Sequence, residues 1–147
     1  MAESPIYSHL KAQIGKEVAD MPQGFSTWLQ PKILEVEDGS ITIEVAVRPK
    51  MCNPIGTIHG GIHAAILDEL IGMTVAAMGN ESHFVSLNMT VDFLRAVAGL
   101  EKVRATCNVI KRGRTTMHII GQVSDLNGKE LSRATVNMVS SGKPLSF

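Results

Sequence analysis

Few features of this sequence point to metal, disulfide or nucleic-acid chemistry. The two cysteines, Cys52 and Cys107, are too few for a disulfide framework, and no Cys-x-x-Cys or other zinc spacing occurs. Lysine plus arginine equals aspartate plus glutamate, at 14 each, so no overall field favours nucleic acid or an anionic membrane. These absences favour a small-molecule partner, no metal and a reducing compartment.

The first residues also lack a targeting signal, and no apolar run is long enough to span a membrane. No basic stretch precedes an apolar one there, and the first arginine is Arg48. The longest mostly apolar run, residues 62–78, is interrupted by one histidine and two acidic residues and is shorter than the ~20 residues of a spanning helix. We therefore expect a cytoplasmic protein without a membrane partner, in which this run is a buried helix.

The N-terminal segment has the hydrophobic period of a helix. Ser4 and Pro5 resemble an N-cap and a first-turn proline, and apolar residues then recur at four-residue steps. This pattern predicts a short amphipathic helix within residues 1–22 that ends near Met21. Residues 22–31 are expected to form an extended connection or loop.

From Ile33 the hydrophobic period changes to two, which is typical of half-buried strands. Two such runs flank Asp38 and Gly39, a pair that indicates a hairpin turn. A long apolar segment follows, predicted to be a helix over residues 60–78 with its C-cap at Gly79. This helix is apolar almost all round, so other elements must cover it.

Four further strand-like runs follow the long helix, joined in part by tight turns. They cover residues 84–94, 102–111, 115–123 and 130–139. An antiparallel sheet of about six strands wrapped round one long central helix is the simplest way to bury that helix, which is an α+β fold. An apolar content of 44% in 147 residues supports one core. We therefore expect a single domain over residues 1–147, with its core in residues 33–139.

The most informative stretch is the glycine-rich entry to this helix. It begins at Asn53 and ends with His59, Gly60 and Gly61. Backbone N–H groups at a helix N-terminus stabilise a developing oxyanion. A carboxylate on an apolar helix, such as that of Asp68, is costly unless it has a role. Together these residues are typical of an acyl-transfer site.

As a set, these residues resemble the hotdog-fold acyl-CoA thioesterases of the PaaI-like, phenylacetate-degradation and 4-hydroxybenzoyl-CoA thioesterase group. The shared pattern is an asparagine, a histidine-glycine-glycine at the mouth of the central helix, and an acid eight positions after the first glycine. A Ser-x-x-Met opening of the next strand, from Ser86 to Met89 here, adds to the likeness. The resemblance covers roughly residues 33–139.

The resemblance implies hydrolysis of an acyl- or aroyl-coenzyme A to the free acid and coenzyme A. Coenzyme A is then part of the substrate, and no cofactor is expected. Asp68 would act as general base or nucleophile, and the Gly60 N–H would hold the oxyanion. Asn53 and Ser86 would orient the water or the carboxylate, and His59 would bond near the thioester or fix the loop. A thioester is already activated, so one carboxylate and N–H donors suffice for this chemistry.

Spacing along the helix predicts that the site is shared between two chains. Eight residues separate Gly60 from Asp68 by roughly 12 Å along the helix axis. Reacting groups must meet within about 3–3.5 Å at one carbonyl. Two antiparallel helices about a two-fold axis would bring Gly60 of one chain to Asp68 of another. The expected catalytic unit is a homodimer with two identical sites, and a dimer of dimers stays open.

Each site assignment has a structural alternative that the sequence leaves open. Asp68 could be a solvated helix residue, and the paired glycines could simply allow the helix start to pack closely. His59 and Ser86 could be purely structural. Asn53 could only form the turn before Pro54.

A basic cluster and a second histidine carry further alternatives. Lys111, Arg112 and Arg114 could form a solvated hairpin tip, or, in this family's setting, could contact the phosphates of coenzyme A. His63 shares a helix face with His59. The pattern has no zincin glutamate between them and no apparent third ligand, so no metal site is expected.

Two rival functions remain on the same fold, whereas a serine hydrolase is excluded by the absence of a Gly-x-Ser-x-Gly elbow. One rival is a non-catalytic acyl-CoA-binding or regulatory module. The other is a hotdog dehydratase, which uses a histidine with an acid in a different sequence setting. An acid at position 68 together with the glycine entry favours the thioesterase.

Overall fold

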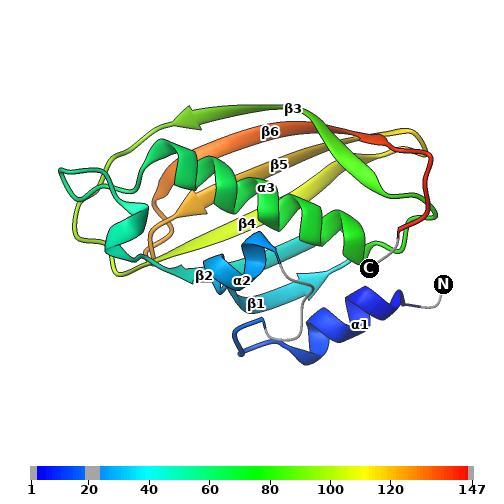
Figure 1. The fold of residues 1–147 in the computed structure, drawn as a ribbon, viewed down its shortest axis with the longest axis horizontal. Coiled ribbons are helices and arrows are strands. Elements are labelled where there is room, and N and C mark those ends of the chain that lie inside the picture. Colours follow the sequence, from blue (N-terminus) through cyan, green and yellow to red (C-terminus); the bar gives the residue numbers. More distant parts are fainter. Residues whose placement is uncertain (1–2, 19–23, 146–147) are drawn as a thin grey trace.

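One six-stranded sheet curves along one long helix, α3 (Gly60–Ala77), in the computed structural model of residues 3–18 and 24–145 (Figure 1). All strand pairs are antiparallel, in the order β1-β2-β4-β5-β6-β3. The strands are β1 (Lys32–Glu37), β2 (Ser40–Ala46), β3 (Phe84–Phe93), β4 (Lys102–Arg112), β5 (Thr116–Ser124) and β6 (Glu130–Ser140). The predicted α+β hotdog architecture is confirmed.

The predicted hairpin of β1 and β2 is confirmed, and its turn has a residue that the geometry requires. In the β1–β2 hairpin, Glu37 pairs with Ser40 across Asp38 and Gly39. Gly39 has a φ of 77°, in the left-handed region that favours glycine. Alternate β2 side chains then point into the core, which fixes the register of the hairpin.

Helix α3 lies lengthwise against the inner face of the sheet. By length and composition it is apolar enough to cross a membrane, but it packs on the sheet as the core helix of this fold. Close packing depends on Gly121 in β5, where an added Cβ would lie 3.0 Å from Leu67 Cδ2. The opposite side of α3, which carries the exposed Asp68, is not covered by the sheet.

The N-terminal helix is shorter than the sequence predicts. Helix α1 (Pro5–Ala12) begins as expected, since the Tyr7 N–H donates to Ser4 Oγ at 3.0 Å, but it ends well before Met21. Gly15 adopts a φ of 82°, and its N–H donates to Ile33 O at 2.8 Å. The chain therefore leaves the helix to bond beside β1. Residues 19–22 of the predicted helix lie outside the described residues.

The prediction of an extended connection or loop over residues 22–31 was wrong in part, because a short helix lies within it. Residues 22 and 23 lie outside the described residues, and α2 (Phe25–Leu29) follows at once. This short helix contacts α3, where Ser26 Oγ donates to a carboxylate oxygen of Glu69. A 3₁₀ turn, η1 (Pro49–Met51), then leads into the glycine-rich loop.

Candidate active site

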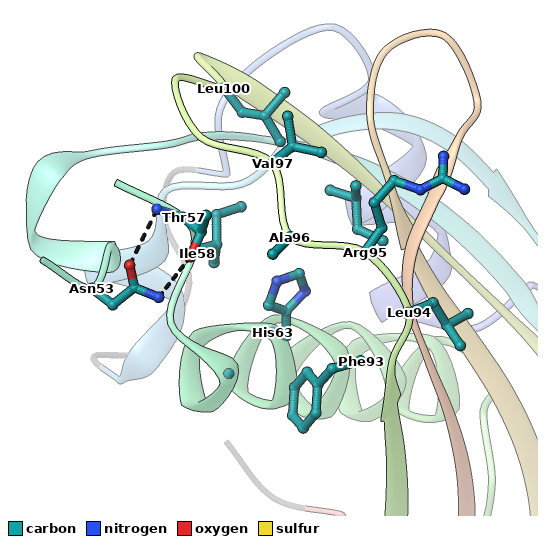
Figure 2. A pocket seen from close by; sticks show the side chains of 12 residues that line it. Asn53, Thr57, Ile58, His63, Phe93, Leu94, Arg95, Ala96, Val97 and Leu100 are labelled. Carbon is teal, nitrogen blue, oxygen red and sulfur yellow. Dashed lines mark hydrogen bonds between the residues drawn. The ribbon is translucent and has the colours of Figure 1, made fainter. Parts of the chain in front are cut away.

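The loop that precedes α3 is shaped by the side chain of Asn53. Its Oδ1 accepts hydrogen bonds from the N–H groups of Ile55 and Thr57, both at 3.2 Å, and its Nδ2 donates to Thr57 Oγ1 at 2.6 Å (Figure 2). Both polar atoms of the Asn53 side chain are therefore hydrogen-bonded within the loop itself. The geometry thus supports the turn-forming alternative for this residue.

His59 closes the first turn of α3. Its Nδ1 accepts a hydrogen bond from the Gly61 N–H at 2.9 Å, so it serves as the N-cap side chain. This bond satisfies one of the amide groups that a helix start leaves unpaired. His59 therefore fixes the loop, as one of its predicted roles requires.

The Gly60 N–H, in contrast, has no hydrogen-bond acceptor among the residues described in the structure. Gly60 lines a pocket of about 260 Å³ at the N-terminal end of α3 (Figure 2). An added Cβ at this position would lie 3.1 Å from Cε1 of Phe93, which covers the glycine from β3. An unpaired amide in a partly enclosed pocket is the arrangement that an oxyanion donor needs.

Asp68 lies two helical turns further on, in a separate pocket of about 380 Å³. Its Oδ1 accepts a hydrogen bond from Ser86 Oγ at 3.0 Å. The side chains of both residues are exposed. One chain therefore brings Ser86 to Asp68 and Phe93 to Gly60, but it does not bring Asp68 to Gly60.

The basic cluster lies at the other end of α3 from the Gly60 pocket. Arg112 donates to Met78 O at 2.8 Å and pairs with Asp38 at 3.4 Å, so its guanidinium is occupied by the protein. Lys111 and Arg114 are exposed near it. None of these three residues lines either pocket described above.

Three residues of the Gly60 pocket were not predicted to belong to the site: Phe93 and Arg95 were not singled out, and His63 was considered only as a metal ligand. Arg95 and Phe93 line the pocket from the end of β3, and His63 lines it from the first turns of α3 (Figure 2). His63 bonds through Nδ1 to Ser132 Oγ at 2.7 Å. The signal available in the sequence for His63 was a single polar side chain between the glycine entry and Asp68, where the other side chains are apolar. No group of metal-ligating side chains occurs in the part of the chain that the structure describes.

Burial lowers the pKa of His63 below its usual value of 6.5. The unfolded chain therefore binds a proton at this histidine more readily than the folded chain does. The contribution to stability is complete above pH 6.5 and is lost as the pH falls toward the lowered pKa of the folded state. We expect the Tm of wild type to fall more between pH 7.5 and 5.5 than the Tm of His63→Gln, whose amide does not titrate. Equal falls in thermal unfolding scans would contradict this assignment.

Comparison with known proteins places these features in a family. The model of the thioesterase superfamily matches residues 55–132, just over half of the chain. The chain belongs to this thioesterase superfamily. The match contains Gly60, Asp68 and Ser86, and it ends at Ser132.

Known members of the superfamily share the fold with modest sequence identity. Human acyl-coenzyme A thioesterase 13 is 26% identical over 83 residues, which are 56% of this chain and 59% of the human protein. The chain thus matches less than two thirds of that relative's length. A phenylacetic acid degradation-related protein of Ralstonia eutropha has a TM-score of 0.77 at 27% identity, covering 91% of this chain and 98% of its own.

A third similarity involves a protein with bound coenzyme A. The structure of a hypothetical thioesterase protein of Streptococcus pneumoniae with coenzyme A has a TM-score of 0.71 at 22% identity. The match covers 78% of this chain and 88% of the other. At this identity the likeness shows the fold alone. With the family match, the predicted resemblance to hotdog thioesterases of the phenylacetate-degradation group is confirmed.

Proposed function

We propose that this protein hydrolyses acyl- or aroyl-coenzyme A thioesters, as a homodimer whose two sites each use both chains. The observation that carries the proposal is the unpaired Gly60 N–H at the start of α3, inside a pocket. Membership of the thioesterase superfamily and the name of the human relative support the substrate class.

The chemistry is divided between the start of α3, at Gly60, and Asp68 two turns later. The Gly60 N–H, at the positive end of the helix dipole, stabilises the charge that develops on the thioester oxygen. Asp68 activates a water molecule or attacks the carbonyl carbon itself. The hydroxyl of Ser86 donates to one oxygen of Asp68 and so orients the carboxylate. His59 and Asn53 act indirectly, because their side chains fix the loop that presents Gly60.

The edge strand β3 supplies the surface for the dimer. Among the described residues β3 pairs with β6 on one side only, and it carries exposed apolar side chains, including Leu87 at 65% and Phe93 at 60% exposure. A long apolar edge of this kind favours pairing with another strand. A second copy of β3 is the partner that a two-fold axis provides.

The register between the two β3 strands can be inferred from the two β3 residues that contact α3. Ser86 contacts Asp68, and Phe93 covers Gly60. Antiparallel pairing centred between Met89 and Thr90 would set Ser86 of one chain opposite Phe93 of the other. Asp68 of one chain would then approach Gly60 of the other, and the two pockets would join into one site.

The same dimer would also bring the basic cluster of one chain toward the site where coenzyme A binds. In an antiparallel pair of helices, the C-terminal half of one α3 extends past the N-terminus of the other. Arg112 bonds to Met78, ten residues or roughly 15 Å along the helix from Asp68. In the dimer, this end of α3 and the neighbouring Lys111 and Arg114 would lie on the side of the other chain's Gly60 pocket. We propose that Lys111 and Arg114 bind the coenzyme A phosphates there. Arg95 is closer to the reacting groups than these two residues, because it lines the Gly60 pocket itself. A dimer of dimers, cytoplasmic localisation and the absence of a cofactor remain predictions.

Thiol release tests the proposed activity directly. Purified protein is mixed with short, long and aromatic acyl-CoAs and a thiol reagent, and we expect continuous release of coenzyme A with at least one of them. Burial raises the pKa of the Cys107 thiol to about 11, so that thiol contributes little background. Binding of acyl-CoA without thiol release would instead favour the non-catalytic module, and hydration of an enoyl-CoA would favour the dehydratase.

A further inference from the structure

His63 places a second polar group in the pocket that holds the Gly60 N–H. The residue is three positions after Gly60, so both lie on one side of α3. Figure 2 shows the imidazole rising from the helix into the pocket, near Ala96. Only 6% of the residue is exposed, and its burial lowers the pKa, so the ring is neutral near pH 7. A neutral imidazole has one N–H donor and one acceptor nitrogen.

Ser132 determines which nitrogen carries the hydrogen. Its Oγ lies 2.7 Å from Nδ1 of His63, and the serine is 0% exposed. Among the described residues the Ser132 hydroxyl has no other hydrogen-bond partner. If Nδ1 carried the hydrogen, the hydroxyl proton would be buried without an acceptor, which is costly. The hydroxyl therefore donates to Nδ1, and the imidazole hydrogen resides on Nε2.

The Nε2–H group of His63 has no partner among the residues described. Within residues 3–18 and 24–145, the fully buried side-chain nitrogens and oxygens without a partner are His9 Nε2 and Arg48 Nε. The unpartnered Nε2 of His63 is therefore not fully buried. Phe93 packs against the imidazole edge to face, with ring centroids 5.9 Å apart at 76°. The donor is thus held in place by Ser132 and Phe93 and faces the pocket.

We propose that His63 donates a hydrogen bond from Nε2 to a carbonyl oxygen of the substrate, and that Ser132 is the positioning residue that keeps it a donor. The inference rests on the proposed thioesterase function. Two carbonyls of an acyl-CoA have this chemistry: that of the thioester, and the first amide carbonyl of the coenzyme A arm. In the first case His63 is a second oxyanion donor beside Gly60. In the second it aligns the arm.

The kinetic test removes the donor without leaving a buried hydroxyl unpaired. The double variant His63→Leu, Ser132→Ala replaces both groups, and His63→Gln keeps an amide donor at a similar reach. We expect the double variant to lose roughly tenfold or more in kcat/KM with acyl-CoA, because one donor to a developing oxyanion contributes about 10²–10³ in kcat. His63→Gln should recover part of that loss. A double variant within twofold of wild type on every substrate would overturn the proposal.

Two smaller substrates distinguish the carbonyls. An acyl N-acetylcysteamine thioester keeps the first amide, whereas an acyl propyl thioester lacks it. A loss of similar size on both would assign the bond to the thioester carbonyl. A loss confined to acyl-CoA and the N-acetylcysteamine thioester would assign it to the amide. Ser132→Ala alone should reduce kcat/KM in the His63 protein but not in a His63→Leu background, because its effect passes through the histidine.

Nitrogen NMR of the imidazole tests the inference without any activity. In ¹⁵N-labelled wild type at pH 7.5, we expect the His63 signals to show a protonated Nε2 and an unprotonated Nδ1. In Ser132→Ala the shifts should move toward a mixture of the two tautomers. A protonated Nδ1 in wild type would overturn the proposal even if thiol release is observed. Absent thiol release with protonated Nε2 would contradict the proposed function instead.

Discussion

Asp68→Asn is expected to reduce thiol release from acyl-CoA by roughly 10²–10⁴-fold, and by more if the carboxylate is the nucleophile. The amide cannot accept a proton from water, and it cannot form an acyl-enzyme anhydride. Because the Asp68 side chain is exposed and its bond to Ser86 can be kept by an amide oxygen, the fold and substrate binding should change little. Initial rates and Tm measured on the same preparations separate these effects.

The neighbouring carboxylate provides a matched control. Glu69 follows Asp68 on α3, but its carboxylate accepts a hydrogen bond from Ser26 of α2. Glu69→Gln preserves an acceptor for that bond and removes one negative charge from the same helix. Its rate should stay within about threefold of wild type. Activity of Asp68→Asn in that same range would remove Asp68 from the mechanism.

Much of the fold could be predicted because it is encoded by local periods. The alternation in β1 and β2 around Gly39, and the start of α3 at Gly60, are properties of short stretches. The end of α1 could not be predicted in this way. It depends on the left-handed Gly15 and on its bond to Ile33 of β1, which is a tertiary contact. Helix α2 has five residues, too few to show a period.

Some site residues could be predicted from the sequence and others could not, again because local patterns are visible in a sequence and tertiary contacts are not. Asp68 and Gly60 stand out because a carboxylate and paired glycines are unusual in an apolar helix. His63 was noticed only as a possible metal ligand, because a single histidine on such a helix is commonly a satisfied core residue. Its partner Ser132 is 69 positions away, and only the packing of β6 against α3 brings the two together. A short sequence window cannot contain that information.

The prediction that the site is shared can be tested with variants that damage different halves of it. Asp68→Ala removes the carboxylate. Gly60→Pro removes the N–H at a first helical position that accepts proline, after His59 with a ψ of 138°. A proline also adds atoms near Phe93, so Gly60→Ala, which adds a Cβ there but keeps the N–H, is the matched control. Gly60→Ala should be much more active than Gly60→Pro.

Restoration of activity in mixed dimers tests the shared site most directly. Asp68→Ala and Gly60→Pro, each shown to be inactive and dimeric, are refolded together in equal amounts. Under two-fold symmetry a mixed dimer contains one site with both lesions and one intact site, so random pairing should restore roughly a quarter of the wild-type rate of thiol release. If each site belonged to a single chain, every site would carry a lesion. No recovery in a sample shown to contain mixed dimers would contradict the shared site.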